Sequence, residues 1–242
     1  MQHKFRSILC LALCAIFTLS LTLPALAAEN EQDCGAKLMA ITFDDGPGDY
    51  TLDLLDALEE RGVKATFFIT GSRVSAYPGV LDAIVAGGHQ LANHTHNHKN
   101  LNTLTAQQVS DEINATRDLL VEAGGDQTYY VRAPYGNANK TVKSVVNAPL
   151  IYWSVDPEDW DAKKAASVLP TIRKEVFPGS VILMHDLHES SVDAALTAID
   201  ELRAQGYRFC TVSELAEKSG TPLQPGEIYS SFRPVDESQK NR

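Results

Sequence analysis

Short apolar segments alternate with segments of helical period along most of this 242-residue chain. Segments typical of strands lie at residues 38–43, 65–70, 89–93, 129–131, 150–155, 181–184 and 207–212. Helical segments separate them, for example at residues 51–58, 105–120 and 192–202. Strands joined by helix-length crossovers run parallel, and strongly apolar strands are covered on both faces. We therefore predict an α/β fold, a closed or nearly closed β/α barrel of about seven parallel strands, with a doubly wound open sheet as the alternative.

The N-terminal segment has the pattern of a secretory signal peptide. Lys4 and Arg6 precede an apolar run over residues 8–23, and Ala25-Leu26-Ala27 forms a small-residue cleavage pattern. We expect cleavage after Ala27 and a protein secreted to the extracellular space or the cell wall, with a retained anchor as the alternative. The expected organisation is a signal peptide at 1–27, a leader at 28–36, one α/β domain at 37–220 and an irregular C-terminal tail at 221–242.

The charge of the chain limits its partners. The formal net charge is −10, and loss of Lys4 and Arg6 with the signal makes the mature chain more negative. This excess of acidic residues argues against nucleic acid and against tight binding to anionic lipid. It does not oppose binding to a neutral sugar polymer. We expect a monomer with no nucleic-acid partner and no membrane span after signal cleavage.

Two cysteines remain once the signal is removed. Cys10 and Cys14 lie in the signal, and Cys34 and Cys210 belong to the mature chain without a Cys-x-x-Cys pattern. Cys34 precedes the first expected strand and Cys210 lies in the last, and closing a barrel brings those two elements together. In an exported protein, we predict a disulfide between them.

Adjacent carboxylates follow the first expected strand. Asp44 and Asp45 come directly after the apolar run 38–43, and Gly46-Pro47 stops the strand. Side chains alternate along a strand, so neighbouring Asp residues share a site only where the extended conformation ends. Two carboxylates side by side repel unless a metal, a cation or a shared proton compensates. A solvated turn is the alternative interpretation of this stretch.

A cluster of histidines predicts a metal site. His94 and His98 are four residues apart, the spacing that places two imidazoles on one face of a helical turn. Asp44 or Asp45 can supply a third ligand, which gives a set typical of catalytic divalent metals. A metallopeptidase is a weaker interpretation, because its zinc helix carries Glu directly after the first His, where Thr95 stands here.

Five motifs together resemble those of the polysaccharide deacetylase family. They are Thr42-Phe43-Asp44-Asp45-Gly46-Pro47, His94-Thr95-x-x-His98, Arg132-x-Pro134-Tyr135, Asp156-x-x-Asp159-Trp160 and Leu183-x-His185, in order along most of the mature chain. The resemblance implies a distorted β/α barrel and metal-dependent removal of acetyl groups from sugars. It also implies that the domain at 37–220 is the catalytic domain.

The resemblance assigns the metal ligands and the catalytic pair. By similarity, Asp45, His94 and His98 hold one divalent metal ion, which we expect to be Zn²⁺, with Co²⁺, Mn²⁺ or Ni²⁺ as alternatives. Asp44 is implied as general base and His185 as general acid. Chemistry agrees with these roles, because amide hydrolysis needs an activated water and a proton for the leaving amine.

The resemblance also names residues that support the catalytic pair or touch the substrate. Arg132 is implied to tune Asp44, since a neighbouring cation keeps a carboxylate ionised. Asp159 is implied to tune His185, since a neighbouring carboxylate raises the pKa of an imidazole. Trp160 and Leu183 are implied to shape the acetyl pocket, and the backbone N–H of Tyr135 to donate to the oxyanion.

The substrate expected from the resemblance is an N-acetylated glycan. The leading hypothesis is an exported deacetylase acting on N-acetylglucosamine units of peptidoglycan. A deacetylase of chitin oligosaccharides or acetylxylan is the alternative among enzymes. From another class, a carbohydrate-binding barrel that has lost catalysis stays open, although Asp44 and His185 are both present.

Overall fold

The computed structural model describes residues 37–124, 129–161 and 165–234, all of which belong to the compact unit Ala36–Arg242. The expected signal peptide, the leader and Cys34 lie outside these residues. Signal cleavage and the Cys34–Cys210 disulfide therefore stay predictions. In the described part, no helix is both long and apolar enough to cross a membrane.

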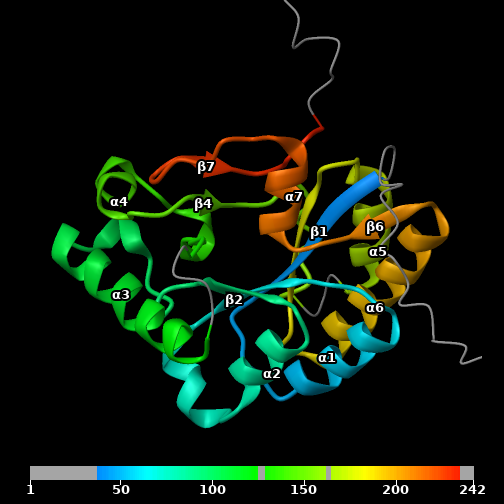
Figure 1. Ribbon diagram of the computed structural model, residues 1–242, viewed down its shortest axis with the longest axis horizontal. Helices are drawn as coiled ribbons and strands as arrows, with labels where there is room; N and C mark the ends of the chain where they lie inside the picture. The colour runs from blue at the N-terminus through cyan, green and yellow to red at the C-terminus, as the bar shows by residue number, and fades with distance from the viewer. Residues whose placement is uncertain (1–36, 125–128, 162–164, 235–242) are drawn as a thin grey trace, which may run out of the picture. The chain divides into compact units, whose positions relative to one another are not determined.

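Five parallel strands form the main sheet. They are β1 (Lys37–Asp44), β2 (Thr66–Ile69), β3 (Gln90–Asn93), β5 (Val181–His185) and β6 (Tyr207–Phe209). The order is β3-β2-β1-β5, and β6 pairs with the start of β1. The long strand β1 therefore lies at the centre of this sheet (Figure 1). Its last residue is Asp44, and Asp45 follows directly.

Short pairings continue the sheet from β3 back to β5. Val131 bridges Asn93 of β3 and Leu150 of β4 (Leu150–Ile151), which pairs in parallel with β7 (Ile228–Tyr229). Ser231 then bridges Ser180, the residue before β5. These contacts close a distorted barrel, so the predicted β/α barrel is confirmed and the open-sheet alternative is wrong.

Helices connect the strands and cover them. The α-helices are α1 (Thr51–Glu60), α2 (Val80–Ala86), α3 (Ala106–Glu122), α4 (Lys140–Val145), α5 (Ala165–Glu175), α6 (Glu189–Ala204) and α7 (Val212–Ser219). Short 3₁₀ segments lie at η1 (Gly71–Ala76), η2 (Leu101–Thr103) and η3 (Pro134–Gly136). A capping box begins α3, because Thr105 and Gln108 exchange side-chain and backbone hydrogen bonds.

The two faces of β1 meet different surroundings. One face packs against the helices in the largest apolar cluster, through Met39, Ile41 and Phe43. The other face points into the barrel and carries smaller or polar residues, which are Ala40, Thr42 and Asp44. This alternation follows from the two-residue period of a strand. It leaves room inside the barrel for a large side chain, which Arg132 provides.

Three expected strands are shorter than predicted. Residues 129–131 form only the bridge at Val131, residues 150–155 form β4 and a separate bridge at Val155, and β6 ends at Phe209. The apolar residues are buried as expected, but the barrel is too distorted here for continuous ladders. Propensity for strands reflects burial as much as backbone pairing, so these segments resembled full strands.

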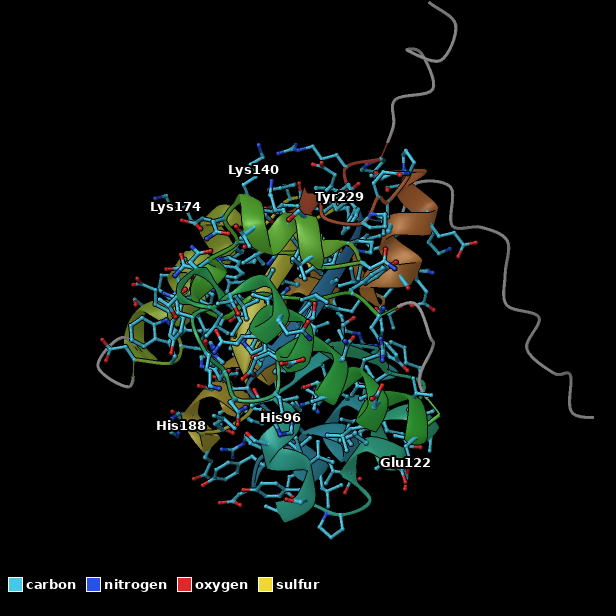
Figure 2. All side chains as sticks on the ribbon, turned by 90° about the vertical axis from the view of Figure 1, so that its left-hand side faces the viewer. His96, Glu122, Lys140, Lys174, His188 and Tyr229 are labelled. Carbon is cyan, nitrogen blue, oxygen red and sulfur yellow. The ribbon has the colours of Figure 1, made fainter. Side chains whose placement is uncertain are left out.

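The expectation of a wholly irregular tail at 221–242 is wrong for its first part. Ile228 and Tyr229 form β7, and Phe232 is buried with its ring stacked against Tyr229, 6.1 Å between centroids. Tyr229 lies at the same end of the unit as Lys140 of α4 (Figure 2). This segment has few apolar residues among Pro, Ser and charged ones, so its composition did not indicate a strand.

Candidate metal centre and catalytic pocket

The carboxyl end of β1 brings both carboxylates to one place. Asp44 is the last residue of the strand, and Asp45 adopts a left-handed backbone conformation with φ of 71°. The extended conformation therefore ends between them, as predicted. Asp44 Oδ2 and Asp45 Oδ1 lie 3.7 Å and 3.3 Å from the same atom, Nε2 of His94.

A buried carboxylate packs beneath this turn. A Cβ on Gly46 would lie 2.7 Å from Oδ1 of Asp186, so only glycine fits there. Thr51 donates to Oδ2 of Asp186 at 2.6 Å and accepts from the backbone N–H of Gly48 at 2.8 Å. Burial raises the pKa of Asp186 to about 6. No sequence motif marks Asp186 apart from its place directly after His185.

The predicted metal ligands lie together. Asp45 Oδ1 is 3.3 Å from Nε2 of His94 and 3.1 Å from Nε2 of His98, and one ligand atom from each residue lies within 4.8 Å of the others. The pKa of Asp45 is lowered, because the two imidazoles outweigh the opposing effect of burial. Of the two open candidates for the third ligand, Asp45 is the carboxylate in this set.

The protonation of His94 makes these three residues fit a metal ion. His94 Nδ1 is 2.8 Å from the carbonyl oxygen of Arg132, and since a carbonyl only accepts, Nδ1 carries the proton. In the neutral ring, Nε2 then carries no proton and faces another acceptor, the Oδ1 atom of Asp45, which is buried without a hydrogen-bond partner among the described residues. A cation between these atoms satisfies both, as in zinc sites where the second ring nitrogen is fixed by a carbonyl.

The loop between the two histidines is not a helical turn, and this part of the prediction is wrong. Thr95 and His98 have φ of 68° and 52°. Side chains hold the loop instead, because Asn93 Oδ1 accepts from the N–H of Thr95 at 2.9 Å and Thr95 Oγ1 accepts from the N–H of His98 at 3.1 Å. The four-residue spacing brought the ligands together through a different backbone path.

Helix α3 anchors this loop through a residue that the sequence analysis missed. Glu112 is buried and accepts from the backbone and side chain of Asn97 at 2.6 Å and 2.9 Å, while Lys99 lies 2.9 Å from its Oε1. Asn93 also donates to the carbonyl of Ile113 at 2.8 Å. The sequence signal that could have indicated a buried role for Glu112 is its spacing of three residues from Val109, which places both on the same buried face of α3.

Arg132 fills the barrel behind Asp44. It is fully buried, and its Nη1 donates to Oδ1 of Asp44 at 2.6 Å and to Oγ1 of Thr42 at 2.8 Å. Its Nε donates to the carbonyl of Ile151 and its Nη2 to the carbonyl of Tyr152, and its guanidinium lies 3.9 Å from the ring centroid of Phe68. The predicted pair is therefore formed, and it leaves Oδ2 of Asp44 directed toward His94.

His185 forms the second carboxylate-supported group. Its Nδ1 donates to Oδ1 of Asp159 at 2.8 Å, and its backbone N–H donates to Oδ2 at 2.8 Å. Burial alone would lower the pKa of His185, but the hydrogen bond and charge of Asp159, with Asp44 and Asp45, raise it to about 9. Nε2 of His185 lies 4.0 Å from Oδ2 of Asp45, so it faces the candidate metal centre.

One cavity of about 440 Å³ joins these groups. It is lined by Asp44, Asp45, His94, His98, Ala133, Tyr135, Trp153, Asp156, Trp160, Leu183 and His185. Eight of the ten predicted site residues are in this lining, while Arg132 and Asp159 lie behind Asp44 and His185. Trp153 is an addition that no motif predicted.

Two aromatic side chains at the cavity are unusually exposed. Trp160 is 56% exposed and Tyr135 is 65% exposed, so neither belongs to the core. The ring of Tyr135 packs edge-on against His98, 4.9 Å between centroids. Its backbone is left-handed with φ of 62°, and within the described part of the chain its N–H donates to no other residue. That N–H is available to a ligand.

The fold and the site together define a barrel with a candidate metal-ligating triad and two candidate acid/base groups at the carboxyl ends of its strands. Comparison with known proteins agrees, because a family model described as Polysaccharide deacetylase matches residues 31–149. A solved structure, described as T48 deacetylase with substrate, matches with a TM-score of 0.76 and 39% identity over 81% of this chain and 97% of that chain. The chain belongs to the polysaccharide deacetylase family.

Two curated relatives act on peptidoglycan according to their names. Peptidoglycan-N-acetylmuramic acid deacetylase PdaC of Bacillus subtilis is 36% identical over 194 residues, or 80% of this chain. Peptidoglycan-N-acetylglucosamine deacetylase PgdA of Listeria monocytogenes is 37% identical over 194 residues, again 80% of this chain. The match spans 42% of the first relative and 41% of the second, so both contain long regions beyond it.

Proposed function

We propose that this protein is an exported, metal-dependent deacetylase that hydrolyses N-acetyl groups of N-acetylglucosamine residues in peptidoglycan. The observation that carries the proposal is the single cavity of about 440 Å³ that contains the metal-ligating triad, Asp44 and His185. Asp44 is paired with Arg132 and His185 with Asp159. Amide hydrolysis needs a metal ion or another group that activates water, a base for the proton of that water and an acid for the leaving amine.

Asp45, His94 and His98 would hold the metal, for which we propose Zn²⁺, with Co²⁺, Mn²⁺ and Ni²⁺ as candidates to compare. The ion would polarise the acetyl carbonyl and lower the pKa of a water. Asp44 then accepts the proton of the attacking water. Its Oδ2 is the accepting atom, because Oδ1 is held by Arg132 at 2.6 Å and Oδ2 faces the triad.

His185 supplies the proton for the leaving amine. An amine leaves readily only once it is protonated, so the acid must carry its proton at the working pH. Asp159 raises the pKa of His185 to about 9 against the effect of burial and so keeps the imidazole charged near neutral pH. Asp159 also fixes the ring by accepting at Nδ1, which leaves the proton on Nε2 directed into the cavity.

The remaining lining residues position the acetyl group. The free backbone N–H of Tyr135 would donate to the oxyanion of the tetrahedral intermediate. Trp160 and Leu183 would enclose the acetyl methyl group, since both line the same cavity.

Peptidoglycan is favoured over other glycans by the names of the two curated relatives. Chitin oligosaccharides and acetylxylan are the alternative substrates. A silent binding barrel is disfavoured, because Asp44 and His185 are both present and both are paired with their supporting groups. From the segment at 1–27, we also propose that the signal is cleaved and that the mature protein is in the cell wall or the medium, which mass spectrometry of those fractions tests. We propose further that the mature protein is a monomer, which sedimentation tests.

The decisive experiment measures acetate release from peptidoglycan, chitin oligomers and acetylxylan by the mature protein loaded with one metal at a time. The proposal expects the highest kcat/KM on peptidoglycan and none with the chelated enzyme. A preference for acetylxylan of about tenfold or more, equivalent to about 1.4 kcal/mol of transition-state stabilisation, would overturn the assignment.

A further inference from the structure

A second hollow adjoins the candidate metal centre. It has a volume of about 290 Å³ and is lined by Asp45, Thr70, Ser72, Arg73, Asn97, His98 and Leu187. Asp45 and His98 also line the catalytic cavity, so the two hollows meet at the metal ligands. A polymer whose acetyl group occupies the catalytic cavity can place a neighbouring part of the same chain in this hollow.

Arg73 is the cation of this hollow, and its position is fixed. Its Nε donates to the carbonyl of Pro47 at 2.8 Å, and its guanidinium lies 5.7 Å from the ring centroid of Tyr77. Tyr77 is itself held by a 2.8 Å hydrogen bond from its hydroxyl to Asp49. An arginine held through Nε and by an aromatic ring keeps its terminal amines in a defined place, which suits bidentate recognition.

The terminal amines of Arg73 lack a carboxylate partner. Across residues 37–124, 129–161 and 165–234, no ion pair joins Arg73 to an acid, although other arginines such as Arg61 and Arg173 are paired. This is unexpected in a chain with a formal net charge of −10. A half-buried guanidinium that lies beside a substrate cavity and has no carboxylate partner among the described residues is available to bind an anion from the ligand.

We propose that this hollow is a subsite for a carboxylate-bearing sugar unit and that Arg73 is its recognition residue. The inference rests on the proposed function and narrows its substrate class. In peptidoglycan, muramic acid carries a lactyl group whose carboxylate is either free or extended by a stem peptide that has carboxylates of its own. Chitin has no such group. Arg73 thereby selects the anionic glycan over the neutral one.

The test compares the metal-loaded wild-type enzyme with Arg73→Gln and Arg73→Lys. Four substrates of equal length are used, which are peptide-free glycan, the same glycan with its carboxylates converted to amides, peptide-bearing glycan and a chitin oligomer. With Arg73→Gln, kcat/KM for the peptide-free glycan relative to the chitin oligomer should fall by about tenfold, because one charge-assisted pair is lost. Arg73→Lys should restore part of the ratio.

Comparison with the amide-converted glycan measures the contribution of the substrate carboxylate alone. The ratio of wild-type to Arg73→Gln activity should be near one on that substrate, and the activity of wild type on the carboxylate form should fall more steeply with salt than that of the variant. A defect only on the peptide-bearing glycan assigns Arg73 to stem-peptide carboxylates, and a defect on the peptide-free glycan assigns it to the lactyl group.

Arg117→Gln is the matched control, because it removes an arginine from the exposed surface of α3. It should leave all substrate ratios as in wild type. Since Arg73 also holds the carbonyl of Pro47, metal affinity is measured in each variant. Equal losses on all four substrates, or a loss of metal affinity that explains them, would overturn the subsite and leave the proposed function standing.

Failure of the proposed function gives a different result. If wild type deacetylates chitin oligomers but no peptidoglycan substrate, the proposed function is wrong, and calorimetric binding of the peptide-free glycan then decides the subsite. Tighter binding to wild type than to Arg73→Gln supports the subsite, and equal binding overturns it.

Discussion

Arg132 Nη1 lies 2.6 Å from Oδ1 of Asp44, with the arginine fully buried and the aspartate 3% exposed. This pair connects the interior of the barrel, which Arg132 fills, to the carboxylate of Asp44 at the cavity. The guanidinium occupies the interior of the barrel, where β1 offers only small or polar side chains, and it leaves one oxygen of Asp44 for the proposed proton transfer. Asp44 therefore depends on Arg132 for its position.

Replacement of Arg132 by Met should destabilise the fold and abolish turnover. The change leaves Asp44 as a buried carboxylate without its cation, and breaking a buried pair in this way costs about 3–5 kcal/mol. Urea unfolding of the metal-free variant measures the loss. The double variant Arg132→Met/Asp44→Asn is the control, because it removes the unpaired charge and should recover part of the stability. Full stability of the single variant would contradict the expected dependence.

Asp44→Asn and Asp45→Asn should separate catalysis from metal binding. The first variant should keep the metal and lose about 10² to 10⁴ in kcat, because an amide cannot take the proton of the attacking water. The second should lose metal affinity, since Asp45 Oδ1 faces both histidines at 3.3 Å and 3.1 Å. Metal content by mass spectrometry and acetate release are measured together. The reverse result would exchange the roles of these neighbours.

The barrel was predictable because its strands are apolar and its crossovers are helical. Periodicity could not reveal that Val131 and Val155 form isolated bridges, since a buried apolar residue looks the same in a full strand and in a single pairing. The tail was missed for the opposite reason. Ile228 and Phe232 are too few to give a period, yet Ile228 pairs with Leu150 of β4 and Phe232 is buried.

The ligand set was predictable from residue chemistry, but its geometry was not. The spacing of His94 and His98 indicated a metal site, while the helical turn that seemed to explain it is replaced by a loop with left-handed residues. The supporting contacts of Glu112 and Asp186 come from elements distant along the chain. Such contacts depend on tertiary packing, and a single sequence carries only a faint signal of them.

Asp159→Asn should move the basic limb of the pH–rate profile to lower pH. The acid must be protonated, so activity falls as the pH rises through the pKa of His185, which Asp159 and its neighbours raise to about 9 against burial. A metal at Asp45 opposes this rise by its positive charge, so the limb of the loaded enzyme lies below that value. Without Asp159, the limb should shift down by about one unit or more.

Folding stability gives an independent measure of the same pair. The folded-state pKa of His185 is about 9 and exceeds its unfolded value of 6.5, so the stabilisation is complete below the unfolded value and is lost as the pH rises toward the folded one. Asp159→Asn should therefore destabilise the protein more at about pH 6 than at about pH 10. Equal losses at both pH values, together with an unmoved basic limb, would exclude this electrostatic role.

Glu112→Gln should weaken metal binding although Glu112 is not a ligand. Glu112 accepts two hydrogen bonds from Asn97, the residue before His98, and pairs with Lys99, the residue after it. The pKa of Glu112 is lowered by these donors against the effect of burial, so the carboxylate is charged when it holds the loop. Loss of that charge should loosen His98 and reduce metal affinity by about 10-fold to 100-fold, as for other groups that orient metal ligands. Competition with a chromophoric chelator measures the affinity.

Glu122→Gln is the matched control, because Glu122 is an exposed residue at the C-terminal end of the same helix (Figure 2). Equal metal affinity in wild type and both variants would show that the loop keeps its ligand geometry without the charge of Glu112.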